Sequence, residues 1–301
     1  MLLGLGLGIW GCQKKQPPPK PAVVSIPTPV VFSGNIFFIH SDHLYKFNLN
    51  TLTPLTAGKS IEWFPACSPS GSEVAYWSNF KSSVYNLWKI QSNGTNPVQL
   101  TNNQINALPS IAQNLLLNDA PAWSPNSKQI VYSLAGNLWL MNSNGYNPET
   151  LLLDYDAYSP AFSPSGRSLI FISKHHSNMF NLWKLNISTL NLTQITHHTR
   201  FNVGDPSFSS NGKKILFNLF NSTSTNICLI DSNGQNAVTL TKNNTSLSPV
   251  FVNDDHFIVY SSSLPNHLTL NLYRMNSNGH HPSLLFNEGN SPSWGPSQST
   301  K

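Results

Sequence analysis

One pattern returns along the chain, and it restricts the possible folds more than any other feature. Its clearest copy is residues 121–145, PAWSPNSKQIVYSLAGNLWLMNSNG. Within this copy, Pro-Ala-Trp is expected to end a short strand, Ser-Pro-Asn-Ser to form a turn, and IVYS and NLWLM to form two more strands. The Asn-Gly that closes the copy suits the positive φ angles of a tight turn. One copy therefore predicts an antiparallel meander.

Five further copies begin with the same proline. Successive starting prolines lie 39 to 56 residues apart, a period typical of propellers and solenoids. The other starts are PACSPSG (65–71), PAFSPSG (160–166), PSFSSNG (206–212), PVFVNDD (249–255) and PSWGPSQ (292–298).

Large side chains recur at two positions of each copy. They would lie at equivalent places in every blade, so the face of one blade can pack on the face of the next. In the second strand they are Phe38, Tyr76, Tyr132, Phe171, Phe217 and Tyr260. In the third strand they are Tyr45, Trp88, Trp139, Trp183 and Tyr273, with Cys228 in the remaining position.

The two ends of the repeat region hold complementary fragments. Residues 34–56 supply the second, third and fourth strands of a copy, while residues 291–297 supply only a first strand. Pairing the two would close a ring and remove its open sheet edges. We therefore predict an all-β, six-bladed β-propeller of four-stranded antiparallel blades over 34–298. The expected blades are 291–297 with 34–56, 63–101, 119–152, 158–196, 204–241 and 247–285.

The charge of the chain argues against a nucleic-acid partner. The formal net charge is +5, but Lys14, Lys15, Lys20 and Lys301 lie outside the ring. The propeller contains thirteen basic and twelve acidic residues, so it has no excess of basic residues from which a nucleic-acid-binding patch could form. We expect a monomer without a cofactor.

The N-terminal segment resembles a bacterial lipoprotein signal. Residues 1–12, MLLGLGLGIWGC, form a short apolar run that ends at Cys12, and residues 13–33 form a tether rich in proline and lysine. The apolar run is too short to span a bilayer, which needs about 20 residues. We favour lipidation of Cys12 and a periplasmic protein anchored to a membrane, with the outer membrane preferred because Gln13 follows the cysteine. The alternatives are an uncleaved signal peptide and a tail with a chance cysteine.

Two cysteines remain in the repeat region. Cys67 and Cys228 fall in the second and fifth blades, on opposite sides of the expected ring. A disulfide needs Cα atoms within about 7 Å, so we expect two buried free thiols.

The strand order predicts two different faces. The loops that lead into each inner strand and those that join the second and third strands share one face, here called the loop face. The SPSG-type and NSNG-type turns share the other, the turn face. The longest loop-face insert, 102–118, spaces its leucines and isoleucines as a short helix does. It could be an apolar lid, but we favour simple packing on the second and third blades.

No metal or catalytic signature stands out. His175–His176 and His197–His198 lie on the expected loop face and His280–His281 on the turn face, and neighbours in an extended segment point apart, so each pair offers one ligand at best. We therefore expect no metal site. The chain has no Gly-x-Ser-x-Gly, His-Glu-x-x-His or glycine-rich phosphate loop, and we expect no enzyme and no catalytic residue.

The repeat resembles that of the TolB family. The shared features are Pro-x-Trp-Ser-Pro-x-Gly, then Asn-Leu-Trp-x-Met-Asn-x-Asn-Gly, and a closing Leu-Thr at 100–101 and 240–241. The resemblance covers about 34–297. It implies a propeller of the bacterial envelope that binds a peptidoglycan-associated lipoprotein, in a system that maintains the outer membrane. That family also carries an α/β domain ahead of the propeller. In this sequence the lipoprotein-like segment and the proline-rich tether stand in that place, so we expect a propeller-only, membrane-tethered relative.

Two hypotheses of function remain open. The favoured one is a non-catalytic, protein-binding scaffold of the cell envelope. The alternative is a divergent metal-dependent sugar-acid lyase or a small-ligand-binding propeller, because similar repeats occur in pectin-fragment lyases. Function on a rigid frame usually lies in its loops, so the partner is expected on the loop face. The candidate contact residues are Trp63, Ile111, Leu115, Asp119, Tyr158, His198, Arg200 and Asp205.

Overall fold

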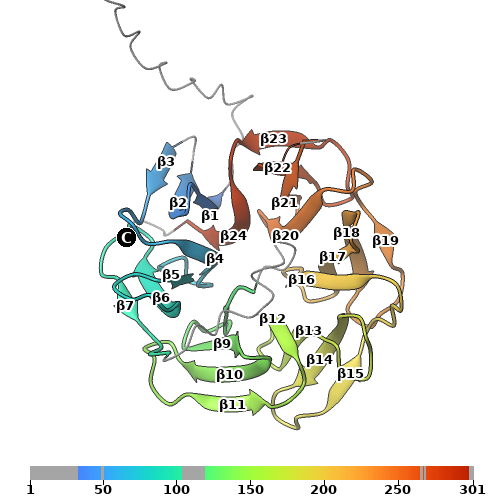
Figure 1. Ribbon diagram of the computed structural model, residues 1–301. Helices are drawn as coiled ribbons and strands as arrows, with labels where there is room; N and C mark the ends of the chain where they lie inside the picture. The colour runs from blue at the N-terminus through green and yellow to red at the C-terminus, as the bar shows by residue number, and fades with distance from the viewer. Residues whose placement is uncertain (1–32, 49–50, 104–118, 265–266, 268, 298–301) are drawn as a thin grey trace, which may run out of the picture.

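The computed structural model forms a closed ring of six four-stranded antiparallel sheets around a central channel (Figure 1). It describes residues 33–48, 51–103, 119–264, 267 and 269–297. Cys12 and the segments 1–12 and 13–32 lie outside these residues, as do Ile111 and Leu115. The fold class predicted from the repeat is confirmed.

Each blade contributes its innermost strand to the channel. Blade one is β24 (Asn290–Pro296), β1 (Gly34–His40), β2 (His43–Asn48) and β3 (Thr51–Pro54). Blade two is β4 (Glu62–Cys67), β5 (Glu73–Ser78), β6 (Asn86–Gln91) and β7 (Val98–Gln99). Blade three is β8 (Ala122–Trp123), β9 (Gln129–Leu134), β10 (Asn137–Asn142) and β11 (Glu149–Leu152). Blade four is β12 (Ala157–Phe162), β13 (Ser168–Ser173), β14 (Asn181–Asn186) and β15 (Leu192–Gln194). Blade five is β16 (Asn202–Phe208), β17 (Lys214–Phe220), β18 (Thr225–Asp231) and β19 (Val238–Thr239). Blade six is β20 (Ser246–Val252), β21 (Phe257–Ser263), β22 (Leu270–Asn276) and β23 (Ser283–Phe286).

The ring closes within blade one, as the two end fragments predict. β24 pairs antiparallel with β1, with Ile36 opposite Trp294 and Gly34 opposite Pro296. The first sheet is therefore built from both ends of the repeat region, and its inner edge is covered (Figure 1).

The recurrent large side chains are direct cross-strand neighbours. All six second-strand positions lie opposite their third-strand positions, which explains why both recur at one spacing. The pairs are Phe38↔Tyr45, Tyr76↔Trp88, Tyr132↔Trp139, Phe171↔Trp183, Phe217↔Cys228 and Tyr260↔Tyr273.

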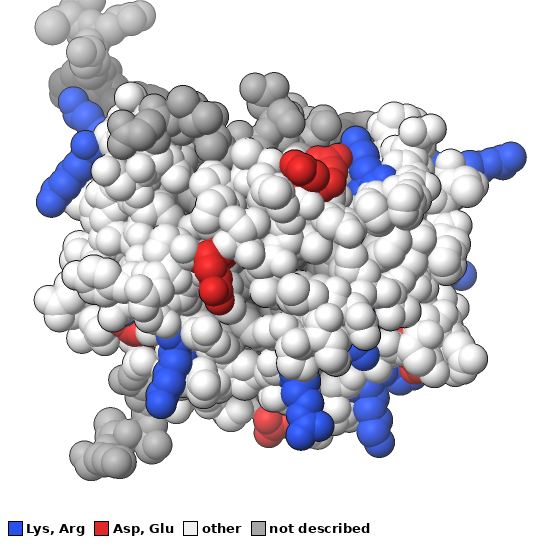
Figure 2. Space-filling model, turned by 90° about the horizontal axis from the view of Figure 1, so that it is seen from below, with Lys and Arg blue, Asp and Glu red and all other residues white. Residues whose placement is uncertain are grey.

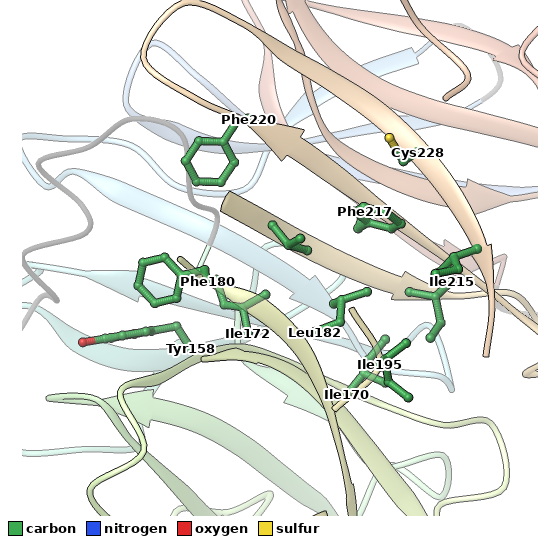
Figure 3. Packing of buried hydrophobic residues seen from close by; sticks show 12 residues of the cluster. Tyr158, Ile170, Ile172, Phe180, Leu182, Ile195, Ile215, Phe217, Phe220 and Cys228 are labelled. Atoms are coloured by element: carbon green, nitrogen blue, oxygen red, sulfur yellow. The ribbon is translucent and has the colours of Figure 1, made fainter. Parts of the chain in front are cut away.

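Apolar clusters fill all six gaps between adjacent blades. Figure 3 shows the one between blades four and five, where Ile170 and Leu182 face Ile215 and Phe217. Burial of one such side chain stabilises the fold by about 1.5–3 kcal/mol. The core is thus a circle of sheet-to-sheet interfaces rather than one central cluster.

The two kinds of turn share one face, as predicted. The backbone N–H of the NSNG-type turn donates to the carbonyl of the SPSG-type turn in the same blade, from Ser92 to Ser72, Ser143 to Lys128, and Ser232 to Lys213. Hydrogen bonds of 2.8 to 2.9 Å join these atoms. The turn face is therefore a regular, bonded surface.

The two thiols of the ring are unbridged, as expected. Cys228 is buried between blades, while Cys67 is partly exposed because its strand lines the channel. Charged side chains are sparse and separated on the side of the ring in Figure 2. Within the described residues, no helix has the length and hydropathy that crossing a membrane requires.

Candidate functional site along the central channel

A ring of prolines surrounds the turn-face end of the channel. The starting prolines of all six copies line a cavity of about 450 Å³ there, together with small side chains such as Ala66, Ala161 and Ser293. Proline has no backbone N–H, and it is tolerated within a sheet at an edge or a bulge. The six prolines are Pro65, Pro121, Pro160, Pro206, Pro249 and Pro292.

The residue before the proline lies in a β-bulge in five blades. Pairing between the inner strand and its neighbour shifts register at this place in every blade except the third. The residue before proline has a φ of +48 to +52° there, although it normally adopts extended backbone. The surrounding structure must hold this strain. The five residues are Phe64, Ser159, Asp205, Ser248 and Ser291.

Buried side chains from the preceding blade hold three of these bulges. Asp119 accepts a hydrogen bond from the Ser159 backbone N–H at 2.8 Å, and Asp205 accepts one from the Ser248 N–H at 3.1 Å. The Ser261 hydroxyl accepts the N–H of Ser291 at 3.2 Å. These contacts link each of the three bulged inner strands to the blade before it, so they fix the shape of the channel wall.

Asp119 is a buried carboxylate with a large shift in pKa. It is 3% exposed, and Oδ1 also accepts a hydrogen bond from the Ser133 hydroxyl. Among the described residues, Oδ2 has no hydrogen-bond partner. Burial raises the pKa of Asp119 to about 6, and the bonds from Ser133 and Ser159 only partly offset that rise. Asp119 therefore connects blades three and four through hydrogen bonds to Ser133 and Ser159.

A second cavity of about 620 Å³ lies at the loop-face end of the ring; it is here called the polar cavity because most of its lining residues are Ser, Thr or Asn. Trp63 lines it from blade two, and the β17–β18 loop at 221–225 lines it from blade five. Trp63 is partly buried, and its indole N–H donates to the Tyr85 hydroxyl at 3.3 Å. Of the predicted contact residues that the structure describes, Trp63 is the one on this cavity.

The remaining predicted residues lie at different depths. Tyr158 is buried, its hydroxyl donates to Asp156 at 2.9 Å, and burial followed by Asp156 raises its pKa. Asp205 lines the turn-face cavity. His198 is partly buried and Arg200 is exposed. The structure therefore distributes the described members of the predicted set along the channel and the loop-face rim, and their role in binding stays a prediction.

A buried amide fixes the rim segment that carries His198. Asn181 is 1% exposed; its Oδ1 accepts the His198 N–H at 2.7 Å and its Nδ2 donates to the His198 carbonyl at 3.1 Å. Burial, followed by the neighbouring His197, lowers the pKa of His198. The imidazole is therefore presented in its neutral form at pH 7.

The histidine pairs do not converge. His175 stacks on His176 with ring centroids 3.8 Å apart, and on Tyr155 at 4.2 Å. Across the described ranges, no three His, Cys, Asp or Glu side chains lie together as metal ligands would.

Sequence reasoning missed the polar cavity. Eleven of its sixteen lining residues are Ser, Thr or Asn, which lie in loops or at strand ends and have no periodic spacing that could reveal them. Their abundance around the starts of β18, β20 and β22 is the only signal that the sequence offers.

Comparison with known proteins agrees with the ring and its repeat. A family model described as the TolB beta propeller domain matches residues 107–298. A search of curated protein sequences gave no significant match.

Solved structures are similar in fold. TolB from Acinetobacter baumannii has a TM-score of 0.73 at 22% identity, covering 91% of this chain and 69% of that one. A chain of a nidogen/laminin complex has a TM-score of 0.68 at 8% identity, covering 88% and 98%. An oligogalacturonate lyase in complex with manganese has a TM-score of 0.53 at 14% identity, covering 86% and 73%. At these identities the likeness concerns the fold alone.

Proposed function

Because this chain belongs to the TolB β-propeller family, we propose that it is a non-catalytic, protein-binding scaffold of the bacterial cell envelope. The proposed partner is an envelope protein, with a peptidoglycan-associated lipoprotein as the first candidate. In this proposal the propeller works in the periplasm as a monomer, tethered through a lipid on Cys12 to the outer membrane, and it contributes to outer-membrane maintenance.

The observation that carries this proposal is the ordered loop-face rim. Asn181 holds the backbone at His198 through two hydrogen bonds, and exposed Arg200 follows two residues later. A surface that is already ordered loses less conformational entropy when a partner binds. Arginine is among the residues that most often dominate binding energy at interfaces.

The test is binding of the purified full-length chain, in detergent, to the peptidoglycan-associated lipoprotein of the same organism by surface plasmon resonance. Replacing Arg200 and His198 together by alanine should weaken binding at least about tenfold, which corresponds to about 1.4 kcal/mol. The matched control is Arg167→Ala, because Arg167 is an exposed arginine on the turn face. It should bind like the wild type.

Two results would count against the proposal. If Arg167→Ala weakens binding as much as the double variant, the docking face is wrong. If the lipoprotein does not bind and the protein instead cleaves oligogalacturonate with added Mn²⁺, the alternative of a sugar-acid lyase replaces the scaffold.

A further inference from the structure

The polar cavity at the loop-face end of the channel has the composition of a site for an uncharged, hydroxyl-rich ligand. Eleven of its sixteen lining residues carry hydroxyl or carboxamide side chains, and the lining includes no lysine or arginine. The two titratable lining residues are His267 and Glu288. Its volume of about 620 Å³ falls within the range of about 300–1,000 Å³ typical of ligand sites.

One amide on this wall is held in a fixed orientation. Oδ1 of Asn221 accepts four hydrogen bonds, from the backbone N–H and hydroxyl of Thr223 and of Ser224, at 2.9 to 3.1 Å. The amide Nδ2 has two N–H donors, and neither bonds to another described residue. The Asn221 side chain therefore offers two donors whose direction is set before any ligand arrives, which lowers the entropy cost of binding.

An aromatic surface lies on the wall contributed by blade two. Trp63 is anchored by its bond to Tyr85 and packs against Phe64, with ring centroids 5.7 Å apart. Its ring also lines the cavity, with Leu247 and Leu270 as the other apolar lining residues. A flat apolar surface among hydroxyl and amide groups matches a sugar ring, which has an apolar C–H face and a polar edge.

The charge of the cavity decides between sugar classes. Glu288 is exposed and would repel a carboxylate on the ligand, while no lysine or arginine on the lining would attract one. A uronic acid polymer is therefore disfavoured against a neutral sugar. A peptide is also disfavoured, because Trp63, Leu247 and Leu270 are the three apolar residues on the lining that could hold its side chains.

We propose that this cavity binds a neutral oligosaccharide, with Trp63 stacking on a sugar ring and the Asn221 amide donating to its oxygens. This site goes beyond the proposed docking function and does not depend on it.

The test is isothermal titration calorimetry of the full-length chain with the tetramer of N-acetylglucosamine, cellotetraose and tetragalacturonate. At least one neutral tetramer should bind at least about tenfold more tightly than tetragalacturonate. Asn221→Asp keeps the oxygen that organises the turn, removes both donors and adds a negative charge, so it should weaken neutral sugar binding at least about tenfold. Trp63→Ala should weaken it independently.

Asn93→Asp is the matched control. Asn93 makes the same kind of turn, accepting the N–H and hydroxyl of Thr95 at 3.0 and 2.7 Å, but it lies in the turn-face sequence Gln-Ser-Asn-Gly at 91–94. Its sugar affinity should equal that of the wild type, as should that of Arg200→Ala, so the docking and sugar proposals can fail separately.

Several outcomes would overturn the sugar proposal. They are binding of neither neutral tetramer, equal or tighter binding of tetragalacturonate, unchanged affinity in both Asn221→Asp and Trp63→Ala, or binding of a short neutral peptide where the sugars fail. Thermal unfolding of each variant shows whether a loss of binding reflects a loss of folding.

Discussion

Replacing the buried carboxylate of Asp119 by a neutral amide should change how stability depends on pH. Burial raises the pKa of Asp119 from its ordinary value of 3.8 to about 6. A shift of this size corresponds to about 3 kcal/mol between the two protonation states. The folded protein therefore holds the Asp119 proton more tightly than the unfolded chain does.

The sign follows from proton binding. Between about pH 4 and pH 6 the folded state keeps a proton that the unfolded state has released, so stability falls as the pH rises through this window. Above pH 6 the ionised, buried carboxylate costs the fold about 3 kcal/mol relative to its stability below pH 4. Tyr158, which lies close enough to Asp119 to interact with it electrostatically, stays neutral throughout because its pKa is raised.

Asp119→Asn keeps an oxygen that can accept from Ser133 and Ser159 and has no charge at any pH. Whatever the substitution costs at pH 4, the stability of the variant relative to the wild type should improve by about 2.4 kcal/mol between pH 4 and pH 7, because part of the full difference is already present at pH 4. Urea unfolding followed by tryptophan fluorescence at pH 4, 5, 6 and 7 measures this difference.

Asp42→Asn is the control, because Asp42 is exposed and its removal changes the net charge equally. Parallel stability curves for Asp119→Asn and the wild type across pH 4 to 7 would refute the reasoning. The same conclusion would follow if Asp42→Asn reproduced the effect.

Two further predictions concern ring closure. A chain truncated before Ser291 lacks nearly all of β24 and leaves the inner edge of β1 unpaired, so its melting temperature in scanning calorimetry should fall by roughly 10 °C or more; an unchanged temperature would contradict closure by this strand. Gly295→Ala should destabilise the protein by about 1–3 kcal/mol, because a Cβ there would overlap Sγ of Cys67. Adding Cys67→Ala should restore part of that loss, and additive costs in the double variant would exclude this contact as the cause.

Much of the ring could be predicted because the same sequence pattern occurs in every blade. Phe171 and Trp183 recur at equivalent places in the other blades, and in the structure they lie directly opposite each other. A period of this kind specifies both the number of blades and the register within each. Closure was predictable for a related reason, since a lone first strand at 291–297 matches the strand missing at 34–56.

The channel was predicted less completely because its geometry depends on contacts between blades. Asp119 and Asp205 were expected to contact a partner, yet both reach across to the backbone of the next inner strand. That contact exists because a bulge turns an N–H toward the neighbouring blade, which residue spacing does not show. Asn221 was missed because a single asparagine in a polar loop has no pattern, and only its four hydrogen bonds distinguish it.

The sheet that joins both ends of the repeat region affects the order of events during synthesis. On the ribosome, β1 emerges about 250 residues before β24 can pair with it. Throughout that interval the nascent chain exposes a row of unpaired backbone groups on β1, a strand that also carries the apolar side chains of Phe37 and Phe38. Blade one can be completed only after the other five have been made, so this early strand is the part of the chain that most needs protection before translation ends.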